Sequence, residues 1–244
     1  MRRNVLITGG SRGIGAACVR AFARAGFSVV FFYRSNEALA EALVNSLRDE
    51  GCDVTAFRCD ISDAEQVAAV MKNVLRVWHR LDVLVNCAGI AHIGLLTDMT
   101  EAEWDHLFAV NVRGAFSVTK AVLPGMISAQ QGCIVNVSSM WGEVGASCEV
   151  AYSAAKAALI GMTKALAKEV GPSGVRVNCV TPGVIDTDMN AQLTDEDRAA
   201  LAEETPLGRI GEADEVAQTI LFLCSEGASF ITGQVLGVSG GLVI

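Results

Sequence analysis

Residues 4–15 read NVLITGGSRGIG, a short β-branched run followed by a glycine-rich turn. The run predicts a strand over 4–8, and Gly9, Gly13 and Gly15 allow a tight turn into a helix that starts at once. A helix N-terminus after such a loop presents free backbone N–H groups and a partial positive charge, which suit a pyrophosphate. This stretch therefore predicts the first unit of an α/β fold with a dinucleotide site.

Six further apolar runs have the length and composition of strands. They are SVVFFY at 28–33, DVTAF at 53–57, DVLVN at 82–86, CIVNV at 133–137, VRVNCV at 175–180 and QVLGV at 234–238. Stretches with apolar residues three and four positions apart separate these runs and predict helices. The alternation predicts a Rossmann-like, doubly wound parallel sheet of about seven strands with helices on both faces. No linker or repeat interrupts the pattern, so we expect residues 1–244 to form a single domain.

The segment 183–207, GVIDTDMNAQLTDEDRAALAEETPL, departs from this alternation. It follows the sixth predicted strand after a Pro-Gly turn and is rich in acidic and short polar residues. Ligands of α/β sheets bind beyond the carboxyl ends of the strands, which is where this segment begins. We expect it to form a mobile, partly helical lid over a substrate.

The overall composition restricts the classes of function. The net charge of −8 disfavours nucleic acids and anionic membrane surfaces as partners. The longest apolar stretch, FSVVFFY, is far shorter than the roughly 18 residues of a membrane span, and MRRNVLITGG lacks the apolar region of a secretory signal. These features predict a soluble, cytoplasmic protein.

Cysteine and histidine positions predict neither a disulfide framework nor a metal site. The eight cysteines contain no C-x-x-C pair, and five of them lie within or at the ends of apolar runs. Reduced thiols in the core fit this distribution best. His79, His92 and His106 share no ligand spacing with one another or with a cysteine.

The end of the second predicted strand indicates which dinucleotide would bind. An acid at this point grips the adenosine ribose of NAD, but here Tyr33 is followed by Arg34, Ser35 and Asn36. Arg34, together with Arg12 in the glycine loop, would attract the 2′-phosphate of NADP, which an acid would repel. The alternative, in which Arg34 is only a solvated loop charge, stays open.

The stretch AYSAAKAALIG, at 151–161, sets Tyr152 and Lys156 four positions apart among alanines. On a helix the two side chains share a face, and a nearby cation lowers the pKa of a phenol from its usual value of about 10. From this stretch alone, the favoured interpretation is an ordinary Ala-rich surface helix with one amphipathic pair.

Four motifs together resemble the short-chain dehydrogenase/reductase family. They are TGGSRGIG at 8–15, NCAG at 86–89, the serines at 138 and 139, and YSAAK at 152–156. The resemblance extends from end to end of the chain and is greatest to the 3-oxoacyl-(acyl-carrier-protein) reductases. Cys87 departs from it, because most members have NNAG where this chain has NCAG.

The resemblance implies a set of catalytic residues, which are Asn111, Ser139, Tyr152 and Lys156. The tyrosine would donate a proton to a carbonyl, the serine would bond the carbonyl oxygen, the lysine would lower the tyrosine pKa and bind the nicotinamide ribose, and the asparagine would hold a water. Trp141 and Cys148 would line the substrate pocket with Ser139 and Tyr152.

The cofactor-binding residues combine the glycine loop and Arg34 with positions that the resemblance implies. They are Gly9, Ser11, Arg12, Gly13, Ile14, Gly15, Arg34, Asp60, Ile61, Asn86, Ala88, Gly89, Tyr152, Lys156, Pro182, Gly183, Ile185 and Thr187. Asp60 is assigned to the adenine end because Ser62, with Glu65 as its capping-box partner, is expected to cap the helix that follows.

The reaction implied is the NADPH-dependent reduction of a 3-oxoacyl thioester, carried by acyl carrier protein or coenzyme A. One alternative is an NADP-dependent reductase of a small free ketone, sugar or sterol. Another is a catalytically silent NADP-binding sensor, which the presence of the tyrosine, lysine, serine and asparagine together disfavours.

Two expectations concern partners. The apolar ending VSGGLVI and the small-residue helix expected at 151–170, with the family's habit, predict a homotetramer. Gln130 and Ser173 stand where reductases of carrier-bound substrates often have arginine, so we expect acyl carrier protein to add little to reactivity. Four other basic residues could still form a local patch for an acidic carrier; they are Lys120, Lys164, Lys168 and Arg176.

Overall fold

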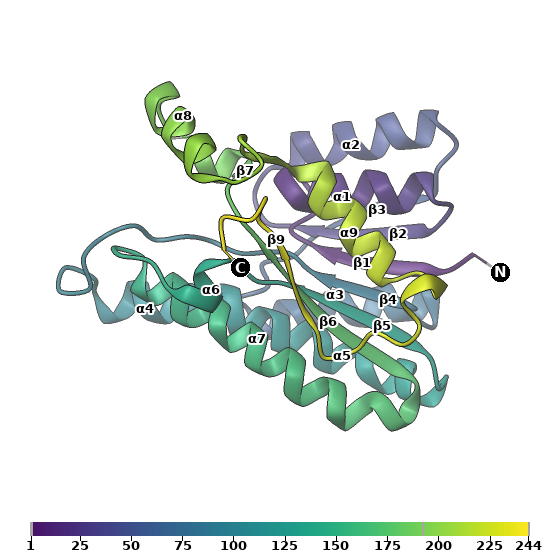
Figure 1. The fold of residues 1–244 in the computed structure, drawn as a ribbon. Helices are drawn as coiled ribbons and strands as arrows, with labels where there is room; N and C mark the ends of the chain where they lie inside the picture. The colour runs from purple at the N-terminus through teal and green to yellow at the C-terminus, as the bar shows by residue number, and fades with distance from the viewer. Residues whose placement is uncertain (1, 192, 244) are drawn as a thin grey trace.

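The computed structural model describes residues 2–191 and 193–243; Met1, Gln192 and Ile244 lie outside the described residues. Seven strands form a parallel sheet in the order β3-β2-β1-β4-β5-β6-β9 (Figure 1). These strands are β1 (Asn4–Thr8), β2 (Ser28–Tyr33), β3 (Val54–Arg58), β4 (Val83–Asn86), β5 (Gly132–Val137), β6 (Val175–Pro182) and β9 (Val235–Val238). All seven predicted strands are confirmed, and β6 runs two residues further than expected.

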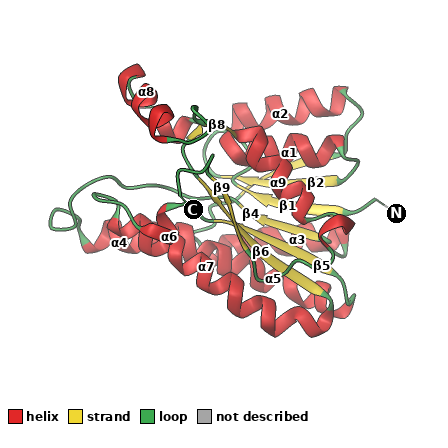
Figure 2. Cartoon of the chain, in the orientation of Figure 1, coloured by secondary structure: helices red, strands yellow, loops and turns green. Residues whose placement is uncertain are grey.

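Helices cover both faces of the sheet, as predicted (Figure 2). One face carries α1 (Gly13–Arg24), α2 (Glu37–Asp49) and α9 (Ala213–Leu223), and the other carries α3 (Ala64–Trp78), α5 (Gly114–Ser128) and α7 (Val150–Val170). The remaining helices, α4 (Glu101–Phe108), α6 (Trp141–Val144) and α8 (Asp195–Glu204), lie toward the carboxyl ends of the strands. Among the helices in the described part of the chain, none has the length and apolar character that crossing a bilayer requires.

The core consists of two apolar layers, one on each side of the sheet. Val5, Ile7 and Phe31 pack under α1, α2 and α9, whereas Leu6 and Phe32 pack under the helices of the other face. Successive strand residues point to opposite faces, so a run that is apolar at every position serves both layers. Full burial of each large apolar side chain contributes about 1.5 to 3 kcal/mol.

The glycine turn after β1 brings backbone segments into close contact. Gly9 has a φ of 71°, which favours glycine. A Cβ on Gly15 would lie 2.1 Å from the Gly9 carbonyl oxygen, so any side chain there would force helix α1 away from the loop. The turn therefore holds the N-terminus of α1 directly above the end of β1.

The cap of helix α3 differs from the expectation. Asp63, not Ser62, is the N-cap residue, and its carboxylate accepts hydrogen bonds from the backbone N–H groups of Glu65 and Gln66. Ser62 instead donates its hydroxyl and its backbone N–H to the Asp60 carboxylate. The Ser62 prediction was wrong because Asp63 lies closer to the first turn and caps as well as serine does.

The segment 183–207 contains a short strand and a helix outside the main sheet. Strand β7 (Ile185–Asp186) pairs with β8 (Gly211–Glu212), and α8 has no buried residue. Figure 1 shows α8 projecting from the body of the molecule, beyond the carboxyl ends of the strands. The partly helical character is as predicted; Gln192, inside this segment, lies outside the described residues.

Candidate active site

A cavity of about 300 Å³ opens at the carboxyl ends of the central strands. It lies where the strand order reverses between β1 and β4, the point at which doubly wound sheets bind ligands. Every predicted cofactor-binding residue except Asn86 lines it. The sequence analysis missed lining residues that adjoin predicted ones along the chain, notably Asn36, Cys87 and the run 188–190.

One end of the cavity presents the N-terminus of helix α1. Arg12 occupies the N-cap position with an extended backbone, and among the described residues no side chain caps this helix and no acid lies in its first turn. The free N–H groups and the helix dipole therefore face the cavity uncompensated. This is the arrangement that binds a phosphate.

Basic and polar side chains surround the adjacent end, beyond β2. Arg34, Ser35 and Asn36 line the cavity. The Arg58 guanidinium donates from Nε to the Arg34 carbonyl oxygen at 3.2 Å, which fixes the backbone at this corner. Arg12 and Arg34 are both exposed residues that line the cavity, and their positively charged guanidinium groups suit an anion.

Asn86 does not line the cavity, although the sequence analysis assigned it to the cofactor. Its side chain is buried and donates to Thr119 Oγ1 at 3.0 Å and to Asn136 Oδ1 at 2.8 Å. Asn136 in turn donates to Thr163 Oγ1 at 2.8 Å. Asn86 thus links β4 to β5 and, through Thr163, to helix α7, because the pleat at the end of β4 turns its side chain toward that helix layer.

Ser139, Tyr152 and Lys156 converge on the cavity from two elements. Ser139 follows β5, while Tyr152 and Lys156 project from helix α7. All three side chains are more than nine-tenths buried, and Lys156 Nζ lies 5.5 Å from the centre of the Tyr152 ring. The four-residue spacing on α7 therefore places both groups on the cavity face, as predicted.

The pKa of Tyr152 moves in the direction opposite to the expected one. Burial raises the pKa of Tyr152 to about 12, although the nearby Ser139 hydroxyl lowers it in part. Lys156 donates from Nζ to the Val137 carbonyl oxygen at 2.9 Å, away from the phenol. The tyrosine is therefore protonated at neutral pH, the form that a proton donor needs.

Burial also lowers the pKa of Lys156, because removing water disfavours its charge. Gly89 lies directly beside this lysine: a Cβ at this glycine would stand 3.3 Å from Lys156 Nζ and 3.1 Å from Asn111 Oδ1. Any side chain at Gly89 would fill the space against the two polar groups. The glycine keeps that space open next to the cavity.

Asn111 lies in a π-helical turn (Ala109–Arg113) between α4 and α5. Its Oδ1 accepts from the Ile90 backbone N–H and its Nδ2 donates to the Ile90 carbonyl oxygen, both at 2.8 Å. Asn111 thus anchors the loop after β4 rather than lining the cavity. A π-helical turn contains one more residue than an α-helical turn, which changes the direction of the side chains in it. Such turns often occur at functional sites.

Neither Trp141 nor Cys148 lines a described cavity. Trp141 packs against the apolar cluster that Leu107, Ala151, Tyr152 and Ala155 form. Cys148 is half-buried, with a φ of 62°, in the loop before α7. The expected substrate pocket thus keeps only Ser139 and Tyr152 at a cavity wall.

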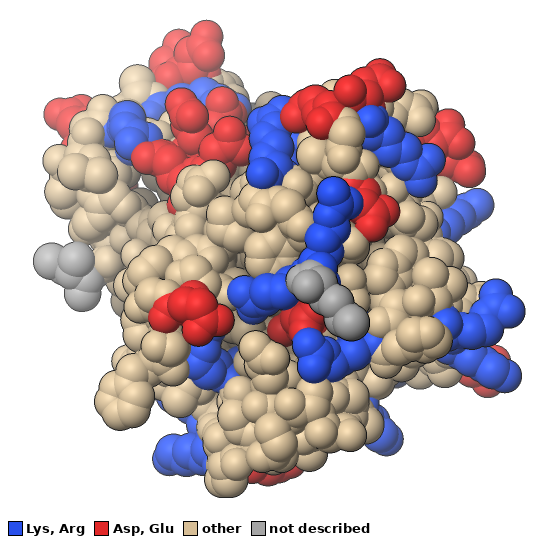
Figure 3. All heavy atoms as spheres, turned by 90° about the vertical axis from the view of Figure 1, so that its right-hand side faces the viewer, with Lys and Arg blue, Asp and Glu red and all other residues tan. Residues whose placement is uncertain are grey.

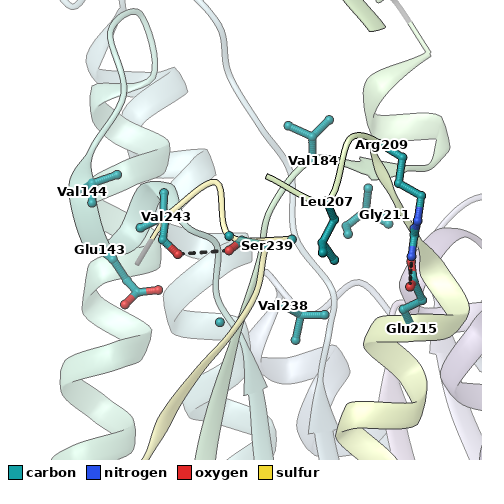
Figure 4. A pocket seen from close by; sticks show the side chains of 14 residues that line it. Glu143, Val144, Val184, Leu207, Arg209, Gly211, Glu215, Val238, Ser239 and Val243 are labelled. Atoms are coloured by element: carbon teal, nitrogen blue, oxygen red, sulfur yellow. Dashed lines mark hydrogen bonds and ion pairs between the residues drawn. The ribbon is translucent and has the colours of Figure 1, made fainter. Parts of the chain in front are cut away.

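A second cavity, of about 510 Å³, lies beside the first and shares Ile185 with it (Figure 4). Its walls come from helix α6, the stretches 184–185 and 207–215, and the C-terminal run 237–243. Figure 4 shows Val144, Val184, Leu207 and Val238 around its centre, with the Arg209–Glu215 ion pair at one side. Sequence reasoning missed this cavity, because it forms only where four distant segments meet.

The chain matches a family model described as "Enoyl-(Acyl carrier protein) reductase" over residues 9–243. It is 44% identical to the 3-oxoacyl-[acyl-carrier-protein] reductase FabG of Thermotoga maritima, covering 98% of this chain and 97% of that protein. It is 41% identical to the reductase of the same name from Chlamydia trachomatis, over 99% and 98%. It is also 39% identical to the uncharacterized oxidoreductase YmfI of Bacillus subtilis, over 99% of each chain.

The cavity fits a nicotinamide dinucleotide. An uncapped helix N-terminus can receive the pyrophosphate, and Gly89 leaves open space beside Lys156 for a sugar. The sheet order, the glycine turn and the Ser139, Tyr152 and Lys156 cluster agree with the full-length matches. The chain belongs to the short-chain dehydrogenase/reductase family.

Proposed function

We propose that this protein reduces a 3-oxoacyl thioester to the 3-hydroxyacyl product with NADPH. The observation that carries the proposal is the convergence of Ser139, Tyr152 and Lys156 beside a cavity that fits the dinucleotide. The substrate class is supported by relatives at about 40% identity over nearly their whole length, whose names specify 3-oxoacyl-[acyl-carrier-protein] reduction.

The mechanism assigns a distinct task to each side chain. A bound nicotinamide supplies the hydride for the carbonyl carbon. The Tyr152 hydroxyl, protonated because burial raises its pKa to about 12, donates its proton to the carbonyl oxygen. Ser139 donates a hydrogen bond to the same oxygen and stabilises the charge that develops there. Lys156 would hold the nicotinamide ribose and would stabilise the phenolate of Tyr152 after proton loss.

The preference for NADPH rests on Arg12 and Arg34, with Ser35 and Asn36 beside them. We propose that both guanidinium groups pair with the 2′-phosphate, which NADH lacks. Hydrogen bonds to charged groups contribute roughly 1.5 to 3 kcal/mol each, so the two would favour NADPH by a few kcal/mol. Replacing Arg34 with Ala should then reduce the preference for NADPH while changing NADH affinity little.

The substrate side of the site is assigned to the segment 183–207 and to the second cavity. The segment begins at the cavity and carries the exposed helix α8, which suits a lid. The apolar walls at Val144, Val184 and Val238 suit an acyl chain. We assign residues 1–244 to one reductase domain, cytoplasmic in location and tetrameric in assembly.

Two other functions are tested beside the proposed one. A small free ketone, sugar or sterol would use the same proton donor, and a silent NADP-binding sensor would bind the cofactor without turnover. An enoyl thioester is a further arm, because the matching family model is described as an enoyl reductase.

A substrate panel decides among these functions. Acetoacetyl thioesters, an enoyl thioester, free 3-oxo acids and small ketones are offered with NADPH or NADH, and nicotinamide absorbance is followed. We expect turnover of the acetoacetyl thioester with NADPH and little with the others. Equal kcat/KM for NADPH and NADH would overturn the cofactor assignment, and faster turnover of a free ketone would overturn the thioester.

A further inference from the structure

Two cysteines on separate elements lie side by side in the core. The Sγ atoms of Cys133, on β5, and Cys224, at the C-terminal end of α9, are 3.6 Å apart. Both side chains are 99% buried and belong to the apolar layer beneath α1, α2 and α9. The two residues are 91 positions apart in the chain, so only folding brings the thiols together.

Two arginines surround this pair. Arg176 donates from Nη1 to the Leu223 carbonyl oxygen at 2.7 Å, and Arg3 donates from Nη1 to the Cys224 carbonyl oxygen at 3.0 Å. Cys133 Sγ itself lies 3.5 Å from the Leu223 carbonyl oxygen. Within the described residues, the buried Nε of Arg3 has no hydrogen-bond partner. The half-buried guanidinium group of Arg3, which keeps one N–H unpaired in the described part of the chain, thus lies close to the two thiols. Apolar side chains could fill the core at these positions equally well.

The surroundings shift the pKa values of the two thiols in opposite directions. The hydrogen-bond partnership with Cys224 lowers the pKa of Cys133, and the positive charges of Arg176 and Arg3 act in the same direction. Burial raises the pKa of Cys224 well above its usual value. Cys133 is therefore the thiol more readily ionised, and the thiolate is the nucleophilic form.

We propose that Cys133 and Cys224 are an oxidation site that closes to a reversible, stabilising disulfide when a hydroperoxide reaches the core. The Cys133 thiolate attacks a peroxide oxygen: an S–O bond forms, the O–O bond breaks, and hydroxide leaves and takes up a proton. Cys224 then attacks the Cys133 sulfenic sulfur: the S–S bond forms, the S–O bond breaks, and a second water leaves with the Cys224 proton. Hydrogen peroxide is reduced, and the dithiol loses two electrons.

The link would lie far from the catalytic cavity. Cys133 is the second residue of β5, and Val137, at the other end of this strand, lines the cavity. Four residues of strand span roughly 13 Å. The disulfide would fasten the C-terminal end of α9 to the sheet and leave Ser139, Tyr152 and Lys156 in place.

The test maps disulfides in the full-length protein. Reduced protein is treated with graded hydrogen peroxide, quenched with N-ethylmaleimide, digested without reductant and analysed by mass spectrometry. We expect one dominant linked peptide pair that contains Cys133 and Cys224 and disappears with dithiothreitol. Recovery of both as alkylated thiols, after the half-buried Cys52 and Cys148 have been oxidised, would overturn the proposal.

Matched variants separate a specific pair from general oxidation. Cys224→Ser should abolish the link and leave Cys133 as a sulfenic acid that dimedone traps, whereas Cys52→Ser should keep the link. Oxidation should raise the midpoint of thermal unfolding by roughly 5 to 10 °C in the wild type and not in Cys224→Ser. A linked wild type with an unchanged midpoint would refute the stabilising role.

Discussion

The guanidinium group of Arg12 lies 3.9 Å from the carboxylate of Asp188, which joins the glycine loop to the segment 183–207. Both residues line the candidate cofactor cavity, and their side chains are 65% and 59% exposed. An exposed pair of this kind contributes at most about 1 kcal/mol. Since Arg12 is also a proposed ligand of the 2′-phosphate, Asp188 competes with the cofactor for the same cation.

Asp188→Asn should therefore strengthen NADPH binding by about two- to fivefold, the range that less than about 1 kcal/mol allows. NADH binding should change less, because NADH lacks the 2′-phosphate. Isothermal titration calorimetry of both cofactors measures the effect. Asp186→Asn is the matched control, since Asp186 pairs with Arg198 at 2.7 Å and does not line the cavity. Weaker NADPH binding in Asp188→Asn would contradict the competition.

Tyr152→Phe should lower kcat by at least the roughly 10² typical of a lost general acid. The ring, buried in a cluster with Leu107 and Ala151, is preserved, so NADPH affinity should stay within about twofold. Steady-state kinetics and cofactor titration measure the two quantities separately. Lys156→Ala should lower both kcat and NADPH affinity, because the lysine is proposed to assist Tyr152 and to bind the nicotinamide ribose. Retained turnover in Tyr152→Phe would remove this residue from the mechanism.

In the cofactor-free protein, Tyr152 should ionise near pH 12, because burial raises its pKa to about 12. An unfolded tyrosine ionises near pH 10. Stability linked to this group is thus fully present below about pH 10 and is lost as the pH rises toward 12. The chain has two tyrosines, so the ultraviolet titration of wild type minus that of Tyr152→Phe isolates the signal. A phenolate signal from Tyr152 at pH 8 would exclude this assignment.

Attachment of the acyl group to acyl carrier protein should add little to kcat/KM. Gln130 and Ser173 lie in adjacent loops, because Gly174, which follows Ser173, approaches the Gln130 carbonyl oxygen. Arg176 donates hydrogen bonds to the carbonyl oxygens of Leu223 and Ile231, so the alternative, a basic patch that includes Arg176, loses one member. Figure 3 shows the molecule from the amino-terminal ends of the strands. On this face, Lys and Arg are interspersed with Asp and Glu and do not form a continuous basic area.

The measurement compares carrier-bound and coenzyme A-bound acetoacetate across ionic strength. We expect similar kcat/KM values and weak salt dependence for the wild type. The double variant Gln130→Arg, Ser173→Arg should gain activity with the carrier at low salt, and lose that gain above about 0.15 M, where charges are screened beyond roughly 8 Å. A large, salt-sensitive preference of the wild type for the carrier would reverse the prediction.

The protein should form a homotetramer. Phe230 is fully exposed, while Phe222 and Leu236 are 47% and 40% exposed on the side of the molecule formed by α9 and the edge strand β9. Clustered apolar groups and an unpaired strand edge favour association. Light scattering at micromolar concentration should give about four times 25.6 kDa. Phe230→Asp should shift the mass downward, and a monomeric wild type would rule the assembly out.

Local patterns in the sequence were sufficient for the sheet and the glycine loop. The seven apolar runs correspond to the seven strands of the main sheet. A strand that is buried on both faces is a continuous apolar run, which can be recognised without knowing which elements pack against it. Tyr152 and Lys156 reached the same face of α7 for an equally local reason, the helical repeat. The glycine loop and Arg34 followed from these elements as cofactor ligands, since the carboxyl ends of parallel strands meet at one edge. The resemblance to the family supplied most of the other cofactor positions.

Contacts between distant segments decided the rest. The direction of the Asn86 side chain depends on Asn136 and Thr119, and the pKa of Tyr152 depends on how completely neighbouring elements exclude water. The Arg12–Asp188 pair and the Cys133–Cys224 pair join residues about 176 and 91 positions apart. Sequence spacing carries no information about such pairs, because the energy of a buried or paired group is set by neighbours from other elements that only the folded chain brings within a few ångströms.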